Sequence, residues 1–166
     1  MPQEKKGSTM THDEYVTSIR ERCSDLFDPT NTEQDWAYLI TVGPGWWPLV
    51  EEYCEQAQAI LRKHGEVGLW IVRQIKEKFG GLRIYIRPVA EPLNVDWYSE
   101  TVHDIDPPQS TPVTELLSDL RGQIIERANQ TCEECGEPGG LRVIDGWYRT
   151  CCDRHFQEWQ ARKGSK

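Results

Sequence analysis

Long hydrophobic runs are absent from this chain of 166 residues. No stretch approaches the roughly 18 consecutive apolar residues from which a transmembrane helix is recognised. Residues 1–10 also lack the apolar region of a secretory signal peptide. We therefore expect neither a membrane span nor export, and we predict that the protein is cytoplasmic.

An excess of positive charge is lacking as well, because 27 Asp and Glu outnumber 19 Lys and Arg and give a net charge of -8. Proteins that coat nucleic acid non-specifically neutralise its phosphates with Lys and Arg, so this balance argues against such binding. The charge is unevenly spread, however. Residues 62–87 carry seven Lys and Arg against two Glu, whereas residues 88–111 carry five Asp and Glu without any Lys or Arg. A basic element followed by an acidic one is either self-neutralising or a gated anion site.

Recognisable catalytic motifs are also missing. The chain has no Gly-rich phosphate loop, nucleophile elbow or metalloprotease helix. His12, His64 and His103 stand apart from one another, and no Asp/His cluster that could hold a catalytic metal is visible. We therefore predict a non-catalytic protein. An enzyme whose active site is dispersed over distant residues is the less favoured alternative.

The clearest positive feature is a set of potential metal ligands near the C-terminus. Cys132, Cys135, Cys152 and His155 follow the pattern C-x2-C-x16-C-x2-H, which supplies the two ligand pairs of a zinc ribbon. Four protein ligands complete a tetrahedral site, so we expect the zinc to be structural. Cys151 is the alternative third ligand, because a C-x3-H spacing is also tolerable.

The remaining pattern predicts an α+β fold, in which a β-hairpin or small antiparallel sheet packs on helices and a C-terminal zinc ribbon follows. Helices are predicted over residues 12–26, 48–63 and 111–129. Strands are predicted over residues 68–76 and 82–87, with a short strand or apolar run at 36–42, and a helix through Lys78 is the alternative to the first of them. In the ribbon, Asp145-Gly146 predicts a tight turn between residues 141–144 and 147–150.

Three regions follow from these elements. Residues 1–10 are polar and expected to be disordered. Residues 11–130 form an α+β core domain, and residues 131–166 form the zinc ribbon with a C-terminal helix. Within the core domain, residues 88–111 are acidic and Pro-rich, and we expect them to form a long loop that is either a lid or a linker.

A candidate ligand site lies in the predicted hairpin of the core domain. Its glycines would let backbone N–H groups approach a ligand, its basic residues supply charge, and its aromatic residues offer a stacking surface. Such a set suits a phosphorylated, nucleotide-type small molecule. The alternative is that the glycines only make a turn, Phe79 caps the core and the lysines are solvated or paired. The predicted ligand-binding residues are Trp46, Trp47, Lys76, Lys78, Phe79, Gly80, Gly81, Arg83, Tyr85 and Arg87.

Four segments, at residues 45–49, 74–85, 131–139 and 146–155, read GWWPL, QIKEKFGGLRIY, TCEECGEPG and GWYRTCCDRH. In this order they resemble a family of small uncharacterised proteins of tailed bacteriophages and prophages. The resemblance implies a phage origin and a host bacterial cytoplasm, and it carries no activity. Where that family tends to have leucine this chain has Cys151, which supports Cys152 as the metal ligand.

Two functions are compatible with these features. In the first, a non-catalytic phage protein captures a nucleotide-type signal for counter-defence, with the acidic loop as a lid. In the second, the zinc hairpin and exposed Trp47, Trp147 or Trp159 dock onto a host protein, which the chain inhibits or adapts. Self-association is compatible with either function, because a ligand cleft can form between protomers.

Overall fold

A computed structural model describes residues 9–89 and 111–165 of the chain. The disorder predicted for residues 1–10 and the loop predicted over residues 88–111 lie almost entirely outside these ranges. None of the helices in the described ranges combines the length and apolarity that a bilayer crossing requires.

The fold is α+β, as the sequence predicts, with a three-stranded sheet, a separate two-stranded hairpin and helices along both. In chain order the elements are α1 (His12–Arg22), η1 (Ser24–Leu26), α2 (Glu33–Leu39), β1 (Ile40–Thr41), η2 (Pro44–Trp46), α3 (Trp47–Lys63), β2 (Trp70–Lys78), β3 (Gly81–Pro88), α5 (Pro112–Ala128), β4 (Gly140–Ile144), β5 (Trp147–Cys151) and α6 (Asp153–Gly164).

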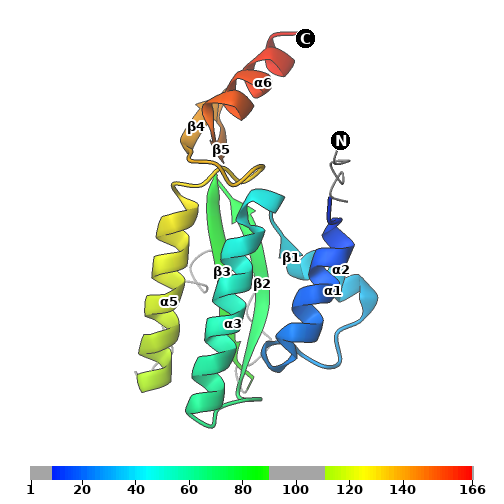
Figure 1. Cartoon of the computed structure of the whole chain (residues 1–166), viewed down its shortest axis with the longest axis vertical. Helices are drawn as coiled ribbons and strands as arrows, with labels where there is room; N and C mark the ends of the chain where they lie inside the picture. The colour runs from blue at the N-terminus through cyan, green and yellow to red at the C-terminus, as the bar shows by residue number, and fades with distance from the viewer. Residues whose placement is uncertain (1–8, 90–110, 166) are drawn as a thin grey trace, which may run out of the picture.

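The main sheet has the strand order β1-β2-β3, in which β2 and β3 are antiparallel and the short β1 runs parallel to β2. Helices α3 and α5 lie side by side along this sheet (Figure 1), and their apolar faces enclose the core with it. Ile75 and Ile84 face each other across the β2–β3 pair and both are buried in this core. The alternation of β-branched residues in the predicted hairpin thus places one face of it against helices.

The helix starts follow local signals. Pro48 stands in the first turn of α3, where its missing N–H is not needed. Thr111 caps α5, accepting a hydrogen bond from the N–H of Thr114, and Pro112 follows it. The predicted helix over residues 12–26 is shorter than expected, because α1 ends at Arg22 and a separate 3-10 turn, η1, follows.

A strand, one of the two interpretations of residues 36–42, is wrong for residues 36–39, because these belong to α2. Thr32 and Asp35 form a reciprocal capping box, in which each side chain accepts a hydrogen bond from the other residue's N–H, at 3.2 Å and 2.7 Å. Trp36 and Leu39 then fall three residues apart on one buried helical face. Only Ile40–Thr41 form a strand.

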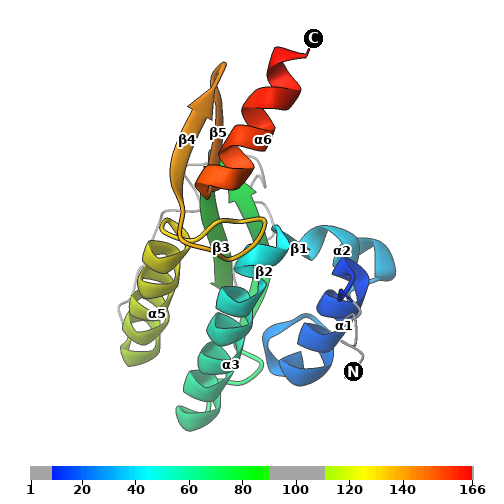
Figure 2. The same ribbon diagram turned by 45° about the horizontal axis from the view of Figure 1, so that its top comes forward.

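The C-terminal part of the structure, residues 131–165, is here called the ribbon. It lies beyond the end of the main sheet where β2 turns into β3, and Figures 1 and 2 both show β4, β5 and α6 at that end. Its strands β4 and β5 are joined by Asp145-Gly146, as predicted, with Ile144 opposite Trp147. The tip of the β2–β3 hairpin therefore meets the base of the ribbon.

Candidate metal centre and adjoining surfaces

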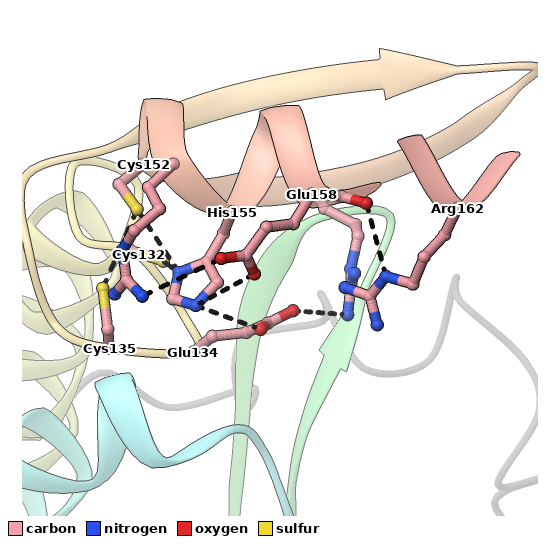
Figure 3. A network of polar contacts seen from close by, with 9 residues as sticks. Cys132, Glu134, Cys135, Cys152, His155, Glu158 and Arg162 are labelled. Atoms are coloured by element: carbon pink, nitrogen blue, oxygen red, sulfur yellow. Dashed lines mark hydrogen bonds and ion pairs between the residues drawn. The ribbon is translucent and has the colours of Figure 1, made fainter. Parts of the chain in front are cut away.

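The four predicted ligands come together in the ribbon. The thiols of Cys132, Cys135 and Cys152 and a ring nitrogen of His155 all lie within 4.8 Å of one another and could hold a metal ion. Figure 3 shows these side chains converging from the segment before β4 and from the start of α6. No disulfide competes for these thiols, because all six cysteines are free.

Two short backbone motifs position the ligands. In the first, the carbonyl of Cys132 accepts a hydrogen bond from the N–H of Gly136 at 2.9 Å, and its own N–H donates to the Glu137 carbonyl at 2.7 Å. In the second, Cys152 is the residue before the first turn of α6, and His155 lies within that turn. The backbone N–H of His155 lowers the pKa of Cys152 to about 7, which favours the thiolate that binds metals.

Cys151 is not part of the group. It ends β5, pairs with Gly140 of β4 and is buried, while Cys152 supplies the third sulfur. The sequence prediction of Cys152 over Cys151 is therefore confirmed for the residues that come together.

The imidazole of His155 is oriented by carboxylates on its outer side. Its Nδ1 faces the thiols, whereas its Nε2 lies 3.5 Å from Glu134 Oε2 and 4.0 Å from Glu158 Oε2 (Figure 3). Glu134 is held in turn by Arg149, whose Nη2 lies 3.0 Å from Oε1. Carboxylates in this position fix the ring and its tautomer in metal sites.

The first ligand pair packs directly on the core domain. The N–H of Gly45 donates to the carbonyl of Glu133 at 2.6 Å, and the indole N–H of Trp46 donates to the carbonyl of Thr131 at 2.8 Å. A Cβ on Gly45 would overlap the carbonyl oxygen of Cys132, so only glycine permits this approach. The loop before α3 therefore serves as a seat for the metal-binding turn.

Glu133 adds a further hydrogen bond to this seat. Its Oε1 accepts from the N–H of Gly43 at 3.0 Å. Burial raises the pKa of this carboxyl, and the nearby charge of Glu77 acts in the same direction.

The tip of the β2–β3 hairpin makes a second contact with the ribbon. The N–H of Gly80 donates to Glu77 Oε1, and its carbonyl accepts from the hydroxyl of Thr150, both at 2.6 Å. A Cβ on Gly80 would overlap the side chain of Leu141. Because both backbone groups of Gly80 have protein partners, the contacts support the structural alternative for this glycine. Gly81 is the first residue of β3 and lies outside the turn.

Both tryptophans of the GWWPL segment also make contacts within the protein. Trp46 is completely buried, and its contact with a ligand stays a prediction. Trp47 is half-buried and stacks on Tyr15 with ring centroids 4.5 Å apart, while its indole N–H donates to the Val42 carbonyl at 3.1 Å. One face of the Trp47 ring is thus covered.

The other predicted ligand residues share the outer face of the β2–β3 hairpin. Lys76 stands opposite Arg83, and Lys78 stands opposite Gly81. Tyr85 and Arg87 follow Arg83 at alternate positions of β3. Tyr85 is buried, however, and Lys76 Nζ lies 5.5 Å from its ring centroid. The predicted grouping of these residues is correct, and their role in ligand binding stays a prediction.

Sequence reasoning missed an apolar surface around the hairpin tip. Phe79 is 61% exposed and meets Tyr148 edge-on, with ring centroids 6.1 Å apart. Val143 stands opposite Tyr148 on this face of the ribbon, and Leu141 lies next to Gly80. We call these four residues the ribbon patch: Phe79, Leu141, Val143 and Tyr148, with exposed fractions of 61%, 57%, 51% and 43%. The alternation of β4 and β5 around Asp145-Gly146 could have identified three of them.

The opposite face of the β4–β5 hairpin is covered by α6. There the guanidinium of Arg142 lies 4.9 Å from the Phe156 ring centroid, and that of Arg149 lies 5.4 Å from the Trp159 ring centroid. Trp159 is buried as a result. Trp147 remains exposed, as one of the two predicted functions requires.

Comparison of the chain with known proteins gives no match to a family model, to a curated protein or to a solved structure. The resemblance to phage proteins therefore stays a prediction. So do the host cytoplasm and the counter-defence role that depend on it.

Proposed function

We propose that this protein is a non-catalytic, zinc-containing binding module that docks an acidic, apolar segment of a partner protein through the ribbon patch. The observation that carries the proposal is Phe79, a large apolar side chain that is exposed on a strained turn. The zinc site stabilises the ribbon. The two contacts between the ribbon and the core domain keep Phe79 next to the ribbon.

The distances within the metal centre support zinc. With bonds of about 2.3 Å to sulfur and about 2.0–2.1 Å to nitrogen, a tetrahedral site places two sulfurs about 3.8 Å apart and a sulfur and a nitrogen about 3.5 Å apart. Cys135 and Cys152 Sγ lie 3.8 Å apart, and His155 Nδ1 lies 3.4 Å and 3.3 Å from Cys132 and Cys152 Sγ. Four protein ligands leave no position for substrate, so the zinc is structural.

The backbone of Phe79 points to a functional role. Its φ of 52° lies in the left-handed region, which costs a residue other than glycine about 1–2 kcal/mol. Asn, Asp or Gly normally occupies this position of a two-residue hairpin turn. Strain of this kind at an exposed site is a reason to propose function, since folding alone favours another residue.

The composition of the ribbon patch fits a protein partner. Large exposed apolar side chains that cluster on a rigid support are typical of docking sites, and aromatic anchors supply much of the binding energy. Lys78 Nζ lies 5.5 Å from the Phe79 ring centroid, and Arg83 Nη1 lies 3.3 Å from the position of a Cβ on Gly81. Lys78 therefore borders the patch, with Arg83 beside the neighbouring Gly81, and positive charge here complements acidic residues on the partner.

Photo-crosslinking tests the proposal. A benzophenone amino acid placed at position 79 is expected to trap one partner in cells of the source organism, whereas the same group at the exposed Leu69, away from the patch, is not. The trapped partner should carry acidic and apolar residues at the crosslink. The affinity of this partner for the wild-type chain should decrease as the salt concentration rises. Its affinity for Phe79→Asn should be at least about 30-fold weaker than for the wild type, a loss of about 2 kcal/mol.

Three outcomes contradict the proposal. The crosslink at position 79 could join two copies of the chain, which would make the patch a homodimer interface. The trapped partner could bind wild type and Phe79→Asn equally. Finally, the partner's contact surface could be basic, which would exclude the role given to Lys78 and Arg83.

A further inference from the structure

A second surface of the molecule, between α2 and β2, forms a cleft with a volume of about 520 Å³. It is separate from the ribbon patch and shares only Lys76 with the predicted ligand residues. Small-molecule sites fall within roughly 300–1,000 Å³ and combine an apolar floor with a few polar groups. Leu39, Ile71 and Val72 are buried apolar residues that line this cleft.

The cleft exists because β1 is short. It pairs with β2 only at Ile75 and Lys76, so within the described residues no strand covers the β2 edge at Arg73 and Gln74. The residues just before β1 belong to α2 and not to the sheet. Gln74 Nε2 donates a hydrogen bond to the carbonyl of Tyr38 in α2 at 3.4 Å. Side chains of α2 and of the edge of β2 consequently face a common space.

A β-bulge brings Arg73 into this space. The register passes from Val72 opposite Ile86 to Gln74 opposite Tyr85, which leaves Arg73 as the extra residue. Counted back from the buried Ile75, strict alternation would place Arg73 on the core face. The bulge gives that position to Val72 and turns the guanidinium outward, as bulges next to functional sites often do. Within the described residues, no carboxylate lies at ion-pair distance from Arg73.

Two carboxylates of the cleft, those of Asp28 and Asp35, each use one oxygen for hydrogen bonds within the protein. Asp28 Oδ1 accepts hydrogen bonds from Thr30, and Asp35 Oδ2 accepts hydrogen bonds from Thr32. These bonds lower the pKa of both carboxyls, so both are charged. In the described part of the chain the second oxygen of each carboxylate has no hydrogen-bond partner. Tyr38 offers a planar ring that is 66% exposed.

We infer that the α2–β2 cleft binds a ribonucleoside phosphate. Arg73 supplies the positive charge for the phosphate, and the Tyr38 ring supplies a stacking surface for the base. The second carboxylate oxygens of Asp28 and Asp35 accept hydrogen bonds from ribose hydroxyls, as acidic residues do in dinucleotide sites. Gln34 and Asn31 also line the cleft, and their amides can read the base edge.

Calorimetric titration of the zinc-loaded full chain with AMP, GMP, CMP and UMP tests this inference. We expect at least one of the four to bind. Arg73→Gln should weaken that binding at least about tenfold, whereas Arg154→Gln, which removes the same charge from α6, should leave it unchanged. Tyr38→Ala should weaken it about tenfold, and Tyr38→Phe should retain it. The matching nucleoside should bind more weakly and respond little to Arg73→Gln.

The inference is overturned if none of the four nucleotides binds at millimolar concentration. It is also overturned if Arg73→Gln and Arg154→Gln have the same effect, which indicates only general charge, or if Tyr38→Ala has none. Inorganic phosphate that competes as well as the nucleotide would reduce the cleft to a simple anion site and exclude the nucleoside. Phe79→Asn should leave nucleotide binding unchanged, so this result is independent of the ribbon patch.

Discussion

Phe79 and Asp145 occupy the same position in two hairpin turns, and each holds its backbone at a φ of 52° with a glycine at a φ of 78° after it. Asp is a preferred residue for this position and Phe is not. The tip of the main sheet therefore carries the residue that its turn disfavours, whereas the tip of the ribbon carries one that its turn favours.

Substitution of Phe79 and substitution of Asp145 should change the stability in opposite directions. We expect Phe79→Asn to raise the free energy of unfolding by about 1 kcal/mol and the melting temperature by about 2–4 °C, because Asn adopts positive φ more readily. Asp145→Phe should lower the free energy of unfolding by a similar amount. Thermal melts of the two zinc-loaded variants measure this. A clear loss of stability in Phe79→Asn would show that the ring is held for packing.

Two glycines provide a matched pair for the seat of the metal-binding turn. Gly45→Ala should destabilise the protein by about 2–3 kcal/mol or more, because its Cβ would overlap the backbone at Cys132. Gly122→Ala, in the middle of α5 with open space around its Cβ, should stabilise the protein by about 0.5–1 kcal/mol. Denaturant unfolding of both variants measures the difference. Equal effects would contradict the close approach at Gly45.

Removal of one ligand should release the metal and loosen the ribbon. Cys135→Ser is expected to lose zinc, whereas Cys151→Ser, which removes the alternative to Cys152, is expected to retain one zinc per chain. Elemental analysis of the purified proteins measures the content. Because Trp46 is bonded to Thr131, the Cys135→Ser variant should also show a red-shifted tryptophan emission. Zinc retention in Cys135→Ser would exclude Cys135 as a ligand, and zinc loss in Cys151→Ser would favour Cys151 over Cys152.

Glu134 should tune the metal centre without binding the metal. Since its carboxylate faces His155 Nε2 at 3.5 Å, Glu134→Gln is expected to weaken zinc affinity by about 10-fold or more. Glu137→Gln serves as the control, because the backbone carbonyl of Glu137, and not its side chain, bonds to Cys132. Competition with a chromophoric chelator measures both affinities. Equal affinities would place Glu134 outside the centre.

Features that depend on neighbours in sequence could be predicted. The spacing of Cys132, Cys135, Cys152 and His155, the turn at Asp145-Gly146 and the start of α5 all lie in short segments. The strand interpretation of residues 36–42 failed for residues 36–39 because the apolar run fits either period, and the cap at Thr32 decided for a helix.

Features that join distant parts of the chain could not be predicted in this way. The bonds of Trp46 to Thr131 and of Thr150 to Gly80 span 85 and 70 residues. These contacts decided that Trp46 is buried and that Gly80 supports the ribbon. The ribbon patch likewise combines Phe79 of the main sheet with residues of β4 and β5, which only the tertiary structure brings together.

The binding affinity of Phe79→Asn for the partner trapped at position 79 shows most directly whether the ribbon patch is the docking site. We expect at least about a 30-fold loss of affinity in a variant that melts no lower than the wild type and contains the same zinc. An unchanged affinity in that variant would contradict the claim that the ribbon patch is the docking site.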